Sequence, residues 1–289
     1  MGYMRPLRTT DRIADESDPE HFWREGYAIV RGLFSRAEIE EIAAATDQLY
    51  AEGIGHGRSF RHGNLFYDVV SAAAGEPLVR MVQWPSYHQP RMDRVRLDTR
   101  IARLIEPLIG PDLKQIINQV HWKAPSKLGH FAWHQDSRSR RPASAYRNLA
   151  TSYVQTGLAI DPHRPESGCM KFIPQSHLRG DLGMDCSKRA LGTAMSDEAL
   201  RAVGLSSADA VELLLEPGDF AMWSPYLVHA SGTNSSDHKR RLYINGYVRA
   251  ADCDRGEWAF ENGRPVPLGQ RPSLVHYEEL YERPEPHYT

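Results

Sequence analysis

The spacing of hydrophobic and polar residues changes about a third of the way along the chain. In the first part, apolar residues recur at helical intervals, and the clearest case is Ile39, Ile42 and Leu49. Ser35 and Glu38 precede them in the arrangement of a capping box, which marks the start of a helix. The helices that this part predicts are 18–25, 35–53 and 98–108, with one strand at 27–31.

From residue 113 onward the chain consists mainly of short apolar runs bounded by Gly, Pro or Asp. Such runs are typical of β-strands. The strands predicted here are 115–122, 131–136, 152–160, 169–173, 220–223, 227–231 and 242–249. Many short strands in succession favour a double-sheet jelly roll. The polar segment 187–210 is predicted to be a partly helical insertion over one end of the barrel.

The predicted fold class is therefore mainly β with helical additions. Its core would be a double-stranded β-helix, a cupin-like jelly roll, flanked by N-terminal helices. A length of 289 residues is compatible with one large domain or two small ones. We expect a single domain in which residues 1–112 form a helical support and lid, 113–250 the jelly-roll core and 251–289 a C-terminal cap.

Bulk composition narrows the range of partners. The formal net charge of −2 gives no reason to expect nucleic acid or an anionic membrane as a partner. No apolar run reaches the roughly 18 residues of a membrane-spanning helix, and the polar first segment lacks the apolar stretch of a signal peptide. Cys169, Cys186 and Cys253 show no paired spacing, which favours a reducing cytoplasm. We expect a cytoplasmic protein that acts on a small molecule, and its oligomeric state stays open.

Two short stretches of the chain combine into a candidate metal site. His134 and Asp136 are two residues apart, so in a strand both side chains would point to the same face. His229 follows about ninety residues later in another predicted strand. Two imidazoles and one carboxylate are the ligands of the facial triad, which holds non-haem Fe(II) and leaves coordination positions open.

Other interpretations of these histidines compete with the triad. The reverse pattern Asp161-Pro162-His163 contains a proline, which strands confine to edges and bulges. His130 and His134 have the spacing of a zinc-protease helix, but that motif needs Glu directly after the first His. A structural His–Asp hydrogen bond is the remaining alternative.

A basic run near the end of the predicted core contains a candidate anion-binding residue. Arg240 follows His229 by eleven residues and could fix an anionic co-substrate. Arg241 competes with it, because adjacent strand residues face opposite ways and only one can point into the barrel. A solvated cluster of Lys239 and these two arginines is the alternative. Ser231, two residues after His229, could add a hydroxyl donor on the same face.

Together with these residues, four segments resemble the phytanoyl-CoA dioxygenase family of Fe(II)- and 2-oxoglutarate-dependent oxygenases. They are Glu25–Phe34, Glu166–His177, Glu216–Phe220 and His229–Asn234. Two departures lie in the segment that we assign to the pocket wall, namely Gln175 where the family has Gly and Ser167 where it has Asn. They leave the metal assignment untouched and widen the choice of substrates.

The resemblance implies that His134, Asp136 and His229 bind Fe(II), with 2-oxoglutarate and O2 as co-substrates. It favours Arg240 for the far carboxylate of 2-oxoglutarate, which a two-pronged guanidinium suits, and it places Arg241 outside the barrel.

Two further residues are candidates for the co-substrate site. Lys123 resembles a family lysine near the co-substrate, although a strand-end lysine exposed to solvent is an alternative. Asn118, on the same predicted strand, is a weaker candidate.

The resemblance also implies the reaction. Because Asp136 supplies a carboxylate where related halogenases have a small residue, we expect hydroxylation of an unactivated C–H bond, with release of succinate and CO2. Desaturation, cyclisation or epimerisation stay open, since they depend on how the substrate is placed. An alternative of another class is a zinc- or nickel-bound sensor or binding protein, which raw metal affinity does not exclude.

The segment that follows Asp136 is rich in arginine. It contains Arg138, Arg140, Arg141 and Arg147. A solvated basic loop is one interpretation. The other is that Arg138 and Arg140 clamp an anionic substrate at the mouth of the barrel.

Overall fold

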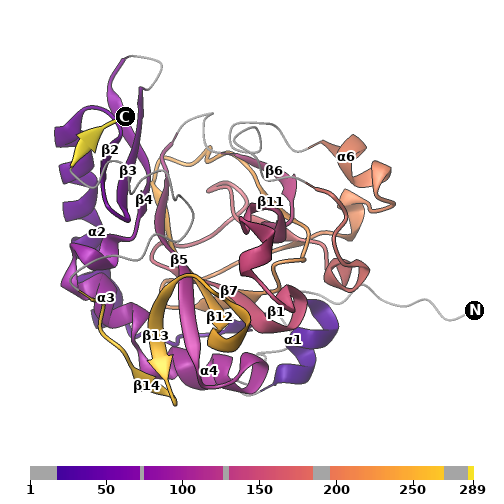
Figure 1. Ribbon diagram of the computed structural model, residues 1–289. Coiled ribbons are helices and arrows are strands. Elements are labelled where there is room, and N and C mark those ends of the chain that lie inside the picture. The colour runs from indigo at the N-terminus through magenta and orange to yellow at the C-terminus, as the bar shows by residue number, and fades with distance from the viewer. Residues whose placement is uncertain (1–17, 72–74, 126–129, 185–195, 270–285) are drawn as a thin grey trace, which may run out of the picture.

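The core of the protein is formed by two antiparallel β-sheets, shown in Figure 1 by a computed structural model that describes residues 18–71, 75–125, 130–184, 196–269 and 286–289. In the larger sheet the strands follow the order β1 (Tyr27–Val30), β10 (Phe220–Trp223), β7 (Tyr153–Ala159), β12 (Arg240–Arg249), β5 (Leu113–Lys123), β4 (Pro77–Gln83), β3 (Leu65–Ser71), β2 (Phe60–His62) and β15 (His287–Tyr288). β13 (Glu257–Glu261) pairs with both β5 and β14 (Arg264–Pro265).

The smaller sheet carries the two histidine-bearing strands. Its order is β6 (Phe131–His134), β11 (His229–Ser231), β8 (Met170–Phe172) and β9 (Val211–Glu212). Its inner face packs against the larger sheet, since Phe172 of β8 lies 5.9 Å from Trp223 of β10 between ring centroids. Leu242 of β12 and Ala159 of β7 belong to the same buried cluster.

Helices cover the outer face of the larger sheet. α2 (Arg36–His56), α3 (Pro90–Arg96) and α4 (Thr99–Ile109) lie along that face in Figure 1. Ile42 of α2 and Ile105 of α4 share one buried cluster with Val120, Leu158 and Tyr243 of the sheet. The two faces of the larger sheet therefore bury different sets of side chains, as the alternation of strand residues requires.

The remaining elements are short. They are α1 (Pro19–Glu25), α5 (Leu149–Ser152) and α6 (Asp197–Ala202), with 3-10 turns η1 (Pro85–Tyr87), η2 (Asp136–Ser139), η3 (Ala143–Ala145), η4 (Ser176–Arg179), η5 (Ser207–Asp209) and η6 (Ala250–Asp252). Within the described ranges, no helix is both long and apolar enough to cross a membrane.

Local sequence accounts for the clearest helix boundaries. The Ser35 side chain accepts a hydrogen bond from the Glu38 backbone N–H and the Glu38 carboxylate accepts one from that of Ser35, so the predicted capping box is present. α4 ends at Gly110, as the pattern predicts. The region 1–112 is not purely helical, because β2, β3 and β4 extend the larger sheet. Residues 187–195 of the predicted insertion lie outside the described residues, and α6 and η5 follow them.

Candidate metal centre and anion site

The two candidate histidines lie directly opposite each other on neighbouring strands. β6 and β11 pair antiparallel with His134 in register with His229. β6 ends at His134, and Asp136 already begins the turn η2. Gln135 between them is still extended, with φ −118° and ψ 134°. Asp136 therefore stays on the same side as His134, although the strand predicted to reach it stops earlier.

The three side chains fit a single metal ion. His134 Nε2 lies 3.9 Å from Asp136 Oδ1, and His229 Nε2 lies 3.8 Å from Asp136 Oδ2. Donor atoms of all three residues lie within 4.8 Å of one another. Metal–ligand bonds to nitrogen and oxygen are about 2.1 Å long, so two donors at right angles on one ion lie about 3 Å apart. Side-chain movements of about 1 Å would bring the three donors to one ion. In the described part of the chain, no other group of histidine, cysteine and carboxylate side chains meets this criterion.

Neighbouring groups orient each donor. His134 Nδ1 lies 2.7 Å from the Ala132 carbonyl oxygen, and His229 Nδ1 lies 2.9 Å from that of Leu227. Each Nδ1–H can donate to its carbonyl, which leaves Nε2 unprotonated and facing the other ligands. Trp223 Nε1–H donates to Asp136 Oδ2 at 3.0 Å.

The ionisation states suit metal binding. Burial, together with the charge of His229, lowers the pKa of His134 to about 4. Burial alone would raise the pKa of Asp136, but the charges of His229 and Arg140 outweigh it and the pKa is lowered. At neutral pH the site offers a neutral imidazole and a carboxylate, so neither has to lose a proton when a metal binds.

A second site of opposite character lies beside the triad. Lys123 of β5 and Arg240 of β12 are paired in register, and each side chain is buried. Lys123 Nζ donates to Ser231 Oγ at 2.6 Å and also to the carbonyl of Gly232. Arg240 Nη1 donates to the Gly168 carbonyl at 2.9 Å, while its Nε–H is buried without an acceptor. Among the described residues, neither cation has a carboxylate within ion-pair distance.

Burial of these two charges is unfavourable without an anion. Burial lowers the pKa of Arg240 to about 10. Burial, and then the charge of Arg240, holds the pKa of Lys123 well below its usual value. Buried charges are normally paired. Two adjacent buried cations without a carboxylate are therefore a candidate site for a small anion.

Arg241, the competitor of Arg240, points to the other face of the larger sheet. Its guanidinium lies 2.7 Å from Asp161 and 3.1 Å from Asp47 of α2. It is buried and not solvated. The pattern Asp161-Pro162-His163 is thereby explained as structural, because His163 Nε2 lies 3.3 Å from the Arg241 carbonyl oxygen.

Asn118 does not join the anion site. Its amide donates to Tyr243 Oη at 2.6 Å and to Asn245 Oδ1 at 2.8 Å on the outer face of the sheet. Its own oxygen accepts from the Ser86 backbone N–H. Asn118 lies five residues before Lys123, so alternation along β5 puts the two on opposite faces.

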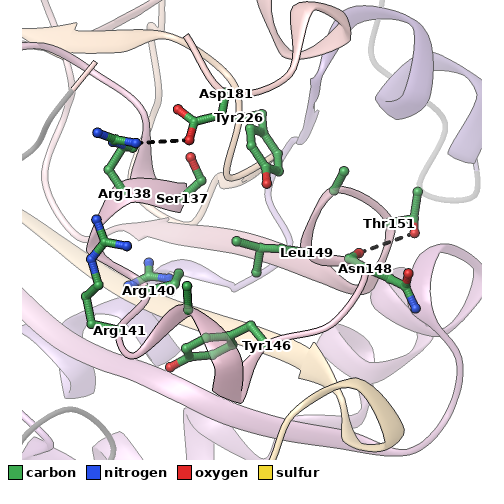
Figure 2. A pocket seen from close by; sticks show the side chains of 12 residues that line it. Ser137, Arg138, Arg140, Arg141, Tyr146, Asn148, Leu149, Thr151, Asp181 and Tyr226 are labelled. Carbon is green, nitrogen blue, oxygen red and sulfur yellow. Dashed lines mark hydrogen bonds and ion pairs between the residues drawn. The ribbon is translucent and has the colours of Figure 1, made fainter. Parts of the chain in front are cut away.

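Three of the four arginines after Asp136 line a cavity of roughly 540 Å³. Figure 2 shows Arg138, Arg140 and Arg141 on one side of it. Arg138 pairs with Asp181 at 3.1 Å. Arg147 does not line the cavity and instead pairs with Asp254 at 2.8 Å.

Two residues near the metal centre were not predicted from the sequence to belong to the site, namely Trp223 and Gln135. Trp223 holds Asp136, and no local pattern distinguishes it from a core tryptophan. The Gln135 side chain donates to the carbonyls of Gly180 and Tyr226 and accepts from the Leu182 backbone N–H. Its position between the ligand candidates His134 and Asp136 is the sequence feature that could have identified it.

Gly168 supplies the carbonyl that accepts from Arg240 and Lys123. Its φ is +67°, and a Cβ would lie only 2.5 Å from the Gly232 carbonyl oxygen. A side chain is therefore excluded here.

A family model described as phytanoyl-CoA dioxygenase matches residues 22–242, which include all three ligand candidates and Arg240. The chain belongs to this family. Membership confirms the enzyme class expected from the sequence, a dioxygenase that depends on Fe(II), 2-oxoglutarate and O2.

Curated relatives of this chain include a fungal and a bacterial dioxygenase. Dioxygenase lolE1 of Epichloe uncinata is 26% identical over 161 residues, which is 56% of each chain. The 2-aminoethylphosphonate dioxygenase of uncultured bacterium HF130_AEPn_1 is 23% identical over 241 residues, which is 81% of each chain. The match thus spans little more than half the length of the fungal relative.

A solved structure has the same fold. It is described as the epimerase SnoN in complex with Fe3+, alpha ketoglutarate and nogalamycin RO. The TM-score is 0.60 at 23% identity, and the alignment covers 88% of this chain and 96% of that one. This likeness confirms the predicted jelly roll.

Proposed function

We propose that the protein binds Fe(II) through His134, Asp136 and His229 and uses 2-oxoglutarate to hydroxylate a small anionic metabolite. The observation that carries this proposal is the adjacency of two complementary sites. Ser231 lies two residues after the ligand candidate His229 on β11 and accepts a hydrogen bond from the buried Lys123, so the two sites adjoin. When bound, iron with 2-oxoglutarate and O2 would supply the oxidising chemistry, with succinate and CO2 as co-products.

The anion site has the properties that the far carboxylate of 2-oxoglutarate requires. Arg240 can present a guanidinium edge to it, and Lys123 a point charge. Ser231 Oγ already accepts from Lys123, so its own hydroxyl hydrogen is available to a carboxylate oxygen. Because both cations are held at fixed positions by the backbone of Gly168 and Gly232, the site is preorganised.

The protein also separates the reaction from water. His134 and His229 are each less than a tenth exposed. In such surroundings charge interactions are stronger than in water. Asp136 supplies the carboxylate of the triad, and this favours hydroxylation over halogenation.

The proposed substrate site is the cavity lined by Ser137, the residue that follows Asp136. Its size falls in the range of small-molecule pockets, roughly 300–1,000 Å³, and Arg138 and Arg140 line it. A cleft with an excess of one charge concentrates ligands of the opposite charge. The relative described as a 2-aminoethylphosphonate dioxygenase agrees with an anionic substrate of small size.

The test is a succinate-release assay with Fe(II), 2-oxoglutarate and a panel of small phosphonates, carboxylates and matched neutral alcohols. We expect release to be stimulated by an anionic member, whose product gains one oxygen atom by mass spectrometry. A product of unchanged mass or one lacking two hydrogens would instead assign epimerisation, desaturation or cyclisation. The matched control is His238→Ala, because His238 is exposed. Succinate release in Asp136→Ala equal to that of the wild type would overturn the proposal.

A further inference from the structure

The cavity is lined by Ser137, the residue after Asp136, and by none of the three metal-ligand candidates. It has one charged wall and one uncharged wall. Arg138, Arg140 and Arg141 lie together on one side in Figure 2, and Leu149 and Asn148 lie across from them. Three arginines line the cavity against a single carboxylate, that of Asp181. A small molecule with an anionic group at one end and an uncharged body would match this arrangement.

The partners of the three arginines differ. Arg138 is neutralised by Asp181 at 3.1 Å. Arg140 is buried, and its guanidinium donates to Tyr153 Oη at 3.0 Å and lies over the ring of the same residue. Arg141 is exposed to the cavity, and within the described residues its side chain makes no hydrogen bond or ion pair.

The backbone around Arg141 is held on both sides. Arg140, directly before it, is fixed by Tyr153 of β7. After it comes η3, and then Tyr146 forms a β-bridge with Cys253. The Arg147 backbone N–H donates to the Asp252 carbonyl at 2.8 Å. Arg141 therefore projects from an anchored segment, which reduces the entropy lost when it binds a ligand.

We propose that Arg141 binds the anionic head group of the substrate, a phosphonate, phosphate or carboxylate, while the uncharged remainder lies against Leu149, Tyr146 and Tyr226. Arg138 and Arg140, the two candidates from the sequence, shape the wall and hold the segment that follows Asp136. This assignment rests on the proposed function, because it names the substrate class for the same cavity.

The experiment measures binding of three probes to the full chain by titration calorimetry. The probes are butylphosphonate, pentanoate and 1-pentanol, which share a short alkyl body and differ in charge. The protein is loaded with Fe(II) and saturated with 2-oxoglutarate without oxygen, so that the probes cannot occupy the site of Lys123 and Arg240. The variants are Arg141→Gln and the control Arg147→Gln, which changes an arginine of the same segment outside the cavity. Circular dichroism verifies that each variant is folded.

We expect both anions, but not 1-pentanol, to bind the wild type. Arg141→Gln should weaken anion binding roughly tenfold or more, as for a lost hydrogen bond to a charged group, and Arg147→Gln should leave it unchanged. The assignment would be overturned if Arg141→Gln bound the anions as tightly as the wild type does. It would also be overturned if the wild type bound 1-pentanol as tightly as the anions, or bound none of the three probes. Failure of 2-oxoglutarate to bind at all would instead contradict the proposed function, and the probes could then be compared in an Arg240→Gln background.

Discussion

Arg240 and Arg241 are neighbours on β12, yet they lie in two regions of the molecule with opposite electrostatic organisation. On the outer face, Arg241 is enclosed by Asp161 and Asp47 and ties the sheet to α2. On the inner face, Arg240 and Lys123 are buried with only backbone carbonyls and a hydroxyl as acceptors. The difference teaches that burial of a cation does not by itself indicate a structural role. A charge whose partner is part of the fold stabilises the fold, and one without such a partner indicates a ligand.

The largest expected effect concerns the inner face. His134→Ala, Asp136→Ala and His229→Ala should each lower Fe(II) affinity by more than the roughly 10–100-fold that is typical of changes to residues behind the ligands. Anaerobic Fe(II) titration measures this directly, and thermal melting of the metal-free variants checks that they fold. His238→Ala is the control. Retained Fe(II) affinity in any of the three variants would remove that residue from the triad.

The next effect separates the two faces by stability. Arg241→Gln should lower the free energy of unfolding by about 3 kcal/mol, the low end for a broken buried pair, since the Asp47 side chain is half exposed. Arg240→Gln should change the stability of the metal-free protein by only about 1 kcal/mol, because one hydrogen bond is lost while an unpaired buried charge is removed. Urea denaturation gives both values. A larger loss of stability in Arg240→Gln than in Arg241→Gln would mean that Arg240, and not Arg241, stabilises the fold.

A smaller effect tests how Asp136 is held. Trp223→Phe removes the hydrogen bond to Asp136 Oδ2 and keeps most of the aromatic packing. Fe(II) affinity should fall roughly 10–100-fold, while the apparent KM for 2-oxoglutarate should stay near that of the wild type. Trp258→Phe, on β13, is the matched control. If both tryptophan variants bind Fe(II) like the wild type, Trp223 does not position the ligand.

The smallest effect is a shift of a pKa on the inner face. Burial and the positive charges of Arg240 and Lys123 lower the pKa of His121 to about 3. The unfolded chain takes up this proton near pH 6.5, so His121 contributes a loss of stability as the pH falls from about 6.5 toward 3. Arg240→Gln removes a positive neighbour and should raise the pKa of His121, measured by NMR titration. An unchanged pKa would show that the two side chains are not electrostatically coupled.

The sequence predicted the parts of the site that depend on local periodicity. Alternation placed His134 and Asp136 on one side, and it separated Arg240 from Arg241. The same rule would have excluded Asn118, which is an odd number of residues from Lys123. The partners of Arg241 were not predictable, because Asp47 and Asp161 come from distant segments that only the fold brings together.

Contacts between residues that are far apart in the sequence could not be predicted from it either. Trp223 of β10 donates to Asp136 of η2 only because the fold brings together two residues that are 87 positions apart in the sequence. Gly168 appeared within a family-like segment, but its carbonyl acquires a role only when β5 and β12 bring two cations to it. Domain organisation into support, core and cap stays a prediction.

The central claim is that the unpaired cations of the inner face bind 2-oxoglutarate next to the metal, and anaerobic titration of 2-oxoglutarate into Fe(II)-loaded protein tests it most directly. We predict that Arg240→Gln keeps Fe(II) affinity but weakens 2-oxoglutarate binding roughly a hundredfold or more, as for a buried charge deprived of its partner. Arg241→Gln and Lys239→Gln should bind 2-oxoglutarate like the wild type. Unchanged 2-oxoglutarate affinity in Arg240→Gln would contradict the account.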